Sequence, residues 1–319
     1  MSKVRSVFLL AAIGGVVHVA APAAQVGRRP TFKSEVNMVA LALTVTDATE
    51  KRLGGLTKDN FAVYENGKSQ EISFLTEDPA PLDLAILLDT SGSMSSTLAS
   101  VQHAAMQLAA ALRPGDRASF AEVKRGMTSL HPLSDDVGGL ERAVSATRAG
   151  GDTAIYQAIY VALKELEREA VPGEIRRQAL VVLSDGDDTA SLIPFDAVLE
   201  AARRSNVAIY CVSLRPPRLL PRSRTIIQLG SNAVEGDYVL RSLAEQTGGR
   251  AFFKLGPRDL ARVTSGIAAE LANQYSLGYV SADQRADGSF RSVTVRILGS
   301  AVSFVRTRPG YFAPGRSRP

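Results

Sequence analysis

A run of small oxygen-bearing side chains directly follows the most apolar strand-like segment of the chain. Residues 82–94 read LDLAILLDTSGSM, and their apolar half ends at Asp89. Asp89, Ser91 and Ser93 are spaced two apart, so three oxygen side chains can converge where a strand ends and a helix begins. One carboxylate and two hydroxyls suit a hard cation, Mg²⁺, Mn²⁺ or Ca²⁺, and not a soft metal. The segment therefore predicts a metal site.

Two further polar clusters occupy corresponding places in the chain. Residues 150–153 read GGDT and come just before a predicted helix, and residues 184–188 read SDGDD and follow a second apolar strand. In an open α/β sheet, ligands bind beyond the carboxyl ends of the strands, where strand order reverses. The three clusters together offer at least two carboxylates and three hydroxyls, which is enough for a six-oxygen shell once water is counted.

The segments that position these clusters alternate between strand and helix patterns. We expect strands at residues 82–89, 116–123, 126–131, 178–184, 207–214 and 250–254, and helices at residues 95–112, 140–147, 153–168, 195–204, 237–247 and 257–273. This alternation predicts an α/β fold, a doubly wound and mostly parallel sheet with helices on both faces.

Both flanks of this α/β segment are β-rich. Residues 36–47 read as one long strand, and residues 61–74 read as two strands joined at Asn66-Gly67, a strong hairpin signal. Residues 274–280, 290–298 and 302–307 read as strands that follow the last helix. Because the first central strand begins, and the last helix ends, at the edge opposite the metal, we expect the flanks to pair there into one small β-sandwich.

The amino terminus has the pattern of a secretory signal peptide. Basic residues precede an apolar segment and small residues suited to cleavage after Ala23 or Ala24, and an uncleaved anchor is the competing interpretation. We expect a signal peptide at residues 1–24, a β-rich flank at 25–80, the α/β domain at 81–273 and a second flank at 274–319. No transmembrane segment is expected in the mature chain, which would be periplasmic or secreted.

Composition limits the classes of function. The 319 residues carry a net charge of +5, which without a concentrated basic patch gives no support for nucleic-acid binding. The single cysteine, Cys211, lies in an apolar run and is expected to be a buried thiol. The chain therefore cannot form an internal disulfide.

The three clusters, in this order and at these strand ends, resemble the metal ion-dependent adhesion site of the von Willebrand factor type A domain family. Asp89, Ser91 and Ser93 match its first loop, Thr153 its second and Asp185 its third. The resemblance implies direct metal ligation by both serines and by Thr153, with the two aspartates acting directly or through water. The flanks, with YSLGYV and RPGYFAP, resemble a bacterial exported subgroup, the von Willebrand factor A-related domain proteins.

The resemblance implies an adhesion or protein–protein interaction role, in which an aspartate or glutamate of a protein partner completes the shell of the cation. Two alternatives stay open: a structural envelope scaffold with an idle metal site, and a Mg²⁺-dependent phosphotransfer or hydrolytic enzyme. The sequence has no GxSxG, GxxxxGK[ST] or HExxH motif, and no enzyme is predicted.

Other polar residues carry weaker signals. We expect Asp152, Asp187 and Asp188 to act in turns, caps or outer contacts, and His103 and His131 to be packing or solvent residues. The stretch Arg215–Glu235 is long for a strand-to-helix connection. Its arginines could contact an acidic partner beside the metal, or the stretch could be a solvated loop; they are Arg215, Arg218, Arg222 and Arg224.

Overall fold

The computed structural model describes residues 38–171, 174–214, 226–253, 255–299 and 303–315, without the side chains of 226–235 and 257. All of the described residues belong to one compact unit, Asn37–Pro319. The predicted signal peptide lies outside them, as do the four arginines of the predicted insertion. Among the helices that the structure describes, none combines the length and apolar character that a membrane crossing needs.

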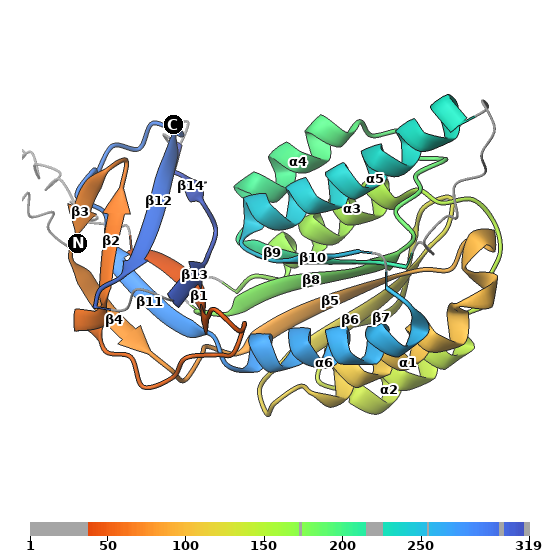
Figure 1. Cartoon of the computed structure of the whole chain (residues 1–319), viewed down its shortest axis with the longest axis horizontal. Coiled ribbons are helices and arrows are strands. Elements are labelled where there is room, and N and C mark those ends of the chain that lie inside the picture. The colour runs from red at the N-terminus through yellow and green to blue at the C-terminus, as the bar shows by residue number, and fades with distance from the viewer. Residues whose placement is uncertain (1–37, 172–173, 215–225, 254, 300–302, 316–319) are drawn as a thin grey trace, which may run out of the picture. The chain divides into compact units, whose positions relative to one another are not determined.

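A six-stranded sheet forms the centre of this unit (Figure 1). In spatial order its strands are β10 (Ala251–Phe252), β9 (Val207–Ser213), β8 (Arg177–Ser184), β5 (Leu82–Asp89), β6 (Arg117–Val123) and β7 (Met127–Ser134). β7 is antiparallel to β6, and all other neighbours are parallel. The chain adds β6 and β7 on one side of β5 and then β8 to β10 on the other. Strand order therefore reverses between β5 and β8, which is where open α/β sheets bind ligands.

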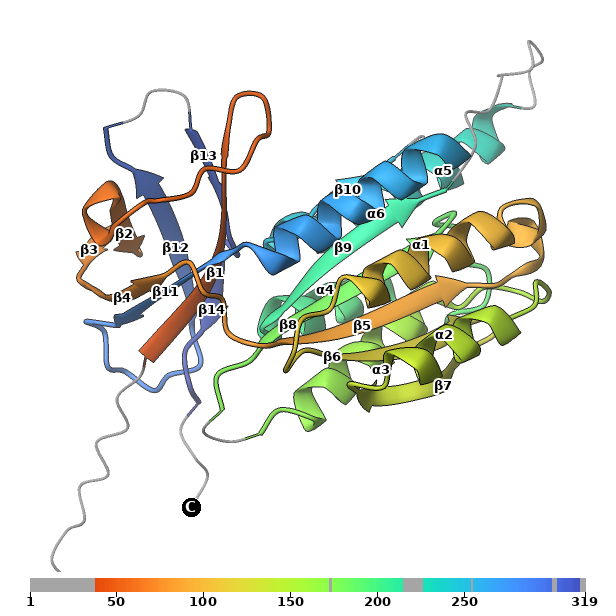
Figure 2. The same cartoon turned by 90° about the horizontal axis from the view of Figure 1, so that it is seen from below.

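Helices cover both faces of this sheet (Figure 2). One face carries α1 (Leu98–Ala110), α2 (Val137–Ala146) and α6 (Pro257–Ala272), and the other carries α3 (Ile155–Arg168), α4 (Phe195–Arg204) and α5 (Ile226–Thr247). Leu84 and Ile86 of β5 point into the first core, and Ala85 and Leu87 into the second. All residues of β5 are buried, as its continuous apolar run requires. The predicted doubly wound α/β fold is confirmed.

The two flanks form two antiparallel sheets with one shared core. One has the order β13 (Ser303–Arg306), β1 (Met38–Asp47), β11 (Tyr275–Val280), β4 (Ile72–Thr76), and the other β14 (Gly310–Phe312), β12 (Phe290–Ile297), β2 (Phe61–Glu65), β3 (Lys68–Gln70). Leu43 and Tyr275 of the first sheet pack with Val63 and Val293 of the second. Each sheet mixes strands from both flanks, so the predicted β-sandwich is confirmed.

The hairpin at Asn66-Gly67 forms, but its second strand divides. Asn66 and Gly67 have φ angles of 48° and 77°, as a type I′ turn requires. After Glu71, the predicted continuation of that strand becomes β4, which pairs with β11 in the opposite sheet. A strand that changes sheets at a sandwich corner looks continuous in sequence. The prediction also missed β14 and a short 3₁₀ turn, η1 (Lys58–Asn60).

Four helix beginnings differ from prediction, and one is that of α2, which begins at Val137 and not at residue 140. α5 begins at Ile226, so the interpretation of Arg215–Glu235 as a connection is wrong from Ile226 onward. Glycine, serine and asparagine in its first turns weaken helix propensity and hide the helix from a sequence pattern. α1 begins at Leu98 because residues Gly92–Ser96 form a 3₁₀ turn, η2, and α3 begins at Ile155, which leaves Thr153 in the preceding loop.

Candidate metal centre

Backbone hydrogen bonds join three loops at the carboxyl ends of β5 and β8. The amide of Gly92 in the first loop donates to the carbonyl oxygen of Gly151 in the second, at 3.0 Å. The amide of Thr189 in the third loop donates to the carbonyl oxygen of Thr153 in the second, at 2.9 Å. The clusters that are far apart in the sequence therefore lie side by side.

Asp89 is the most enclosed of the predicted site residues. It has no exposed surface, its Oδ1 accepts from the amide of Ser91 at 2.9 Å, and its Oδ2 accepts from the hydroxyl of Ser184 at 2.7 Å. Burial raises the pKa of Asp89, and the nearby Asp185 carboxylate adds to the rise, while the hydrogen bonds from the two serines oppose it. Each carboxylate oxygen keeps a second lone pair, so these hydrogen bonds leave Asp89 able to act on a metal ion directly or through a water.

The two serines of the first loop bring their hydroxyls together. Ser91 is buried and Ser93 is exposed, and their Oγ atoms lie 3.0 Å apart. η2 produces this contact, because its tight turn returns the side chain of Ser93 toward Ser91. Adjacent ligands of an octahedral Mg²⁺ with bonds of about 2.1 Å are about 3 Å apart. The serine pair therefore has the spacing of two neighbouring ligand positions.

Thr153 and Asp185 enter from the other two loops, and both are buried. The Oδ1 of Asp185 accepts from the amide of Asp187 at 3.2 Å, and the amide of Thr153 donates to the hydroxyl of Thr189 at 3.1 Å. Gly186 has a φ of 80°, a conformation that glycine adopts without steric cost, and this allows the third loop to turn directly after Asp185.

The donor set decides which metals fit. It contains three neutral hydroxyls and two carboxylates, and the described residues contain no cluster of three or more His, Cys, Asp or Glu that could hold a metal. A shell rich in oxygen and poor in charge suits Mg²⁺, or Mn²⁺ or Ca²⁺, and does not suit Zn²⁺. That these five side chains share one ion stays a prediction.

The weaker candidates have structural partners. Asp188 accepts hydrogen bonds from the first turn of α3 and from its own loop, through both of its oxygens, and Asp152 forms an exposed ion pair with Arg125 at 2.8 Å. His131 is buried and bonded to a serine hydroxyl 2.9 Å away, and His103 is exposed on α1. These positions agree with the roles expected from sequence.

Sequence reasoning assigned no role to Ser184 or to Thr90. The hydroxyl of Ser184 donates to Asp89 and accepts from the amide of Gly186 at 3.0 Å, so it links the first and third loops. The hydroxyl of Thr90 donates to a carboxylate oxygen of Glu122 on β6 at 3.1 Å. The sequence signal for the first role was Ser184 itself, the first residue of SDG, and no signal pointed to Glu122.

A comparison of the sequence with known families supports this geometry. Residues 84–187 match the von Willebrand factor type A domain family, a range that begins in β5 and includes all five predicted metal ligands. The chain contains a von Willebrand factor type A domain. The predicted resemblance to the von Willebrand factor type A (VWA) family is confirmed, and the resemblance of the flanks to a bacterial exported subgroup stays a prediction. No curated protein sequence matches the chain.

Solved structures with a similar arrangement come from several bacteria. A von Willebrand factor type A protein from Catenulispora acidiphila is 12% identical, with 90% of this chain and 76% of that chain covered and a TM-score of 0.49. An aerotolerance-related membrane protein from Bacteroides fragilis is 16% identical, with coverages of 60% and 98% and a TM-score of 0.45. The vWF domain of the pilus tip protein Mfa5 from Porphyromonas gingivalis is 12% identical, with coverages of 60% and 95% and a TM-score of 0.45. The family assignment rests on the sequence match.

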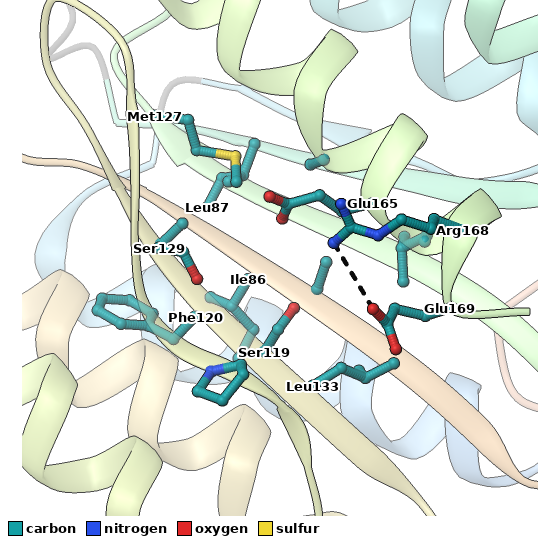
Figure 3. A pocket seen from close by; sticks show the side chains of 15 residues that line it. Ile86, Leu87, Ser119, Phe120, Met127, Ser129, Leu133, Glu165, Arg168 and Glu169 are labelled. Carbon is teal, nitrogen blue, oxygen red and sulfur yellow. Dashed lines mark ion pairs between the residues drawn. The ribbon is translucent and has the colours of Figure 1, made fainter.

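A small cavity of about 100 Å³ lies elsewhere in the VWA domain, between α3 and the β6–β7 edge of the sheet (Figure 3). Ser119 and Ser129 line it beside apolar side chains, and Arg168 forms an ion pair with Glu169 at its rim, at 3.6 Å. None of the predicted metal ligands lines this cavity, so it is a separate feature.

Proposed function

We propose that this chain is an exported binding protein that recognises a protein partner through a divalent cation, with Mg²⁺ the best fit. The ligands are the five side chains predicted from sequence, and an aspartate or glutamate of the partner completes the shell. The single observation that carries the proposal is the meeting of the three loops, with the hydroxyls of Ser91 and Ser93 3.0 Å apart.

The chemistry of the chain's own side chains favours a site that leaves one ligand position of the ion for a partner, rather than a site that the chain fills by itself. Ser91, Ser93 and Thr153 would hold the ion without cancelling its charge, and Asp89 also accepts hydrogen bonds from its neighbours. A bound Mg²⁺ would supply a partly uncancelled positive charge to which a partner's carboxylate is attracted. Ser93 is exposed, so this side of the site is open to a partner.

Export rests on the predicted signal peptide, and the division of the mature chain near residues 80 and 273 rests on sequence patterns. Fractionation of the native cell into cytoplasm, envelope and medium tests the first of these. Recovery of the protein only in the cytoplasm would remove the proposed access to an envelope or extracellular partner.

The proposed function is tested by capture from the native envelope or medium, once with Mg²⁺ and once with EDTA. We expect a partner that is retained only with Mg²⁺, retained by Ser96→Ala and lost by Ser93→Ala. Ser96 is a matched control because it is an exposed serine in the same 3₁₀ turn and outside the predicted ligand set. Circular dichroism checks that both variants fold.

Two results would contradict the proposal. A partner list that is the same with Mg²⁺ and EDTA, although calorimetry shows that the ion binds, indicates a scaffold with an idle site. Magnesium-dependent turnover of a phosphoester that Ser93→Ala abolishes indicates the enzyme alternative.

A further inference from the structure

A cavity of about 340 Å³ lies where the sandwich meets the amino ends of the strands of the VWA domain, at the sheet edge opposite the predicted metal site. Strands β1 and β4 of the sandwich line one side, and the beginnings of β8 and β9 with the end of α6 line the other. This volume corresponds to about ten water molecules. It is separate from the proposed partner site and independent of it.

Two guanidinium groups in this cavity donate only to neutral oxygens. Arg177 donates to the carbonyl oxygen of Ala80 at 2.7 Å, to that of Leu271 and to the side chain of Gln274 at 3.0 Å. Arg308 donates to the carbonyl oxygen of Gly310 at 2.6 Å and to the side chain of Asn206. Within the described part of the chain, neither arginine forms an ion pair.

The acidic residues near the cavity do not compensate these charges. Asp78, the only carboxylate among the residues that line it, forms no ion pair with either arginine. Asp83 lies close by, but it is bound to Arg117 and Arg176. Burial lowers the pKa of both Arg177 and Arg308 to about 10, although the charge of Asp116 partly opposes this fall at Arg177.

Two buried polar atoms at the cavity have no hydrogen-bond partner among the described residues. They are Nη2 of Arg177 and Oγ1 of Thr307. Leaving a buried donor unsatisfied costs free energy, and native proteins rarely do so unless water or a ligand completes the bonding. Two guanidinium groups that have no ion-pair partner at one cavity, beside lining residues with an unbonded buried polar atom, indicate a ligand that accepts hydrogen bonds and carries negative charge.

The remaining lining limits what else the ligand contains. Apolar residues from both sides contribute to the lining, among them Phe74 and Ile175. Leu41, Leu82 and Leu271 also contribute, but their side chains are buried in the adjoining cores. A small inorganic anion would leave this surface in contact with water or empty space. A ligand with an apolar body would cover it.

We propose that this cavity binds a small organic carboxylate, with its carboxylate on Arg177 and Arg308 and its apolar body against the sandwich and the end of α6. Thr307 would donate its hydroxyl hydrogen to the same carboxylate once its side chain turns toward the cavity.

The test is thermal unfolding of the full mature chain in sodium benzoate, sodium phosphate or sodium chloride at equal ionic strength. Benzoate is expected to give a saturable rise in Tm that exceeds the effect of chloride. Arg308→Gln is expected to weaken the apparent Kd for benzoate at least about tenfold, which is the loss of one charge-assisted hydrogen bond.

Two further variants separate binding from stability. Thr307→Val has the same shape and removes a hydroxyl without a partner, so it should fold with a Tm at least as high as that of the wild type and still weaken benzoate binding. Arg306→Gln is the control. Arg306 lies on β13 of the sandwich and is paired with Glu270 of α6 at 2.6 Å, but it does not line the cavity. This variant should lower the basal Tm and leave the benzoate-induced rise intact.

Three results would overturn the assignment. One is no difference between benzoate and chloride, which would mean that water alone fills the cavity. Another is a rise in Tm with phosphate at least as large as with benzoate, which would remove the role of the apolar lining. The third is a benzoate effect that survives Arg308→Gln and Thr307→Val but disappears in Arg306→Gln.

Discussion

Asp83→Asn tests the charge cluster that joins β5 to its neighbours at the amino end of the sheet. Asp83 has no exposed surface, and it accepts from Arg117 through both oxygens at 2.9 and 2.8 Å and from Arg176 at 2.8 Å. Asparagine keeps the shape, removes the charge and turns an amide donor toward two guanidinium donors. The variant isolates the electrostatic contribution.

The expected loss of folding stability follows from the burial of Asp83 and of its two arginine partners. Removing one partner of a buried ion pair costs about 3–5 kcal/mol, because the other charge stays desolvated. Arg117 and Arg176 keep 28% and 15% of their side-chain surface exposed, so the lower end, about 3 kcal/mol, applies. For a folded unit of this size, 3 kcal/mol lowers Tm by about 5 °C.

The pH dependence gives a second measurement with a definite sign. Burial raises the pKa of Asp83, but the hydrogen bonds from Arg117 and Arg176 outweigh it and hold this pKa below its ordinary 3.8. The stabilisation is therefore complete above pH 3.8 and is lost as pH falls through the lower, folded-state pKa. The difference in Tm between wild type and Asp83→Asn should be constant from pH 5 to 8 and narrow in stronger acid.

Differential scanning calorimetry over this pH range measures both effects, with Asp287→Asn as control. Asp287 also has a lowered pKa, but it is a surface residue bonded to a neighbouring serine and should barely affect Tm. If Asp83→Asn melts within about 2 °C of wild type at pH 7, the cluster does not stabilise the fold in the way that its geometry implies.

Three other substitutions test single contacts elsewhere. Glu65→Gln should cost about 3 kcal/mol, because it removes the buried carboxylate 3.6 Å from the guanidinium of Arg291 and leaves only the partly exposed Asp283 as ion-pair partner. Urea unfolding measures the loss, and an unchanged midpoint would contradict it. Gly249→Ala should abolish the soluble fold, because a Cβ there would lie 2.0 Å from the carbonyl oxygen of Ile209 in β9; a normal circular dichroism spectrum and yield would refute this. Gly67→Ala should cost about 1 kcal/mol, because Gly67 has a φ of 77°, and a cost near zero would mean that the turn relaxes to another type.

The sequence predicted the α/β core because its signals are local. The eight residues of β5 are apolar except at the ends, and the polar clusters directly follow β5 and β8, so strand ends could be located without knowledge of pairing. The edge of the sheet at which the flanks meet could also be predicted from the sequence, because a parallel strand and its crossover helix run in opposite directions. This prediction needed only the order and direction of the elements along the chain.

What the sequence did not reveal depends on contacts between distant segments. The change of sheet at Glu71 depends on pairing with β11, which lies about two hundred residues further along the chain. β14 pairs with the nearby β12, but it is only 3 residues long and gives little sequence signal. The beginning of α5 at Ile226 was hidden by residues with low helix propensity, which tertiary packing overrides. At the candidate site, the five ligand types were recognisable, but the bond from Ser184 to Asp89 joins positions 95 residues apart.

The two aspartates of β5 show why the carboxyl end of this strand is suited to a ligand. Asp83 and Asp89 point to the same face of β5, because they are an even number of residues apart, and both are fully buried. Asp83 has two guanidinium partners and a lowered pKa, so the chain itself compensates its charge. Asp89 has serine donors, Asp185 nearby and a raised pKa, and the described residues give it no ion pair. The carboxylate at the amino end of the strand is therefore neutralised by the chain's own arginines. The carboxylate at the other end would be stabilised most by an added cation, as the proposed function requires.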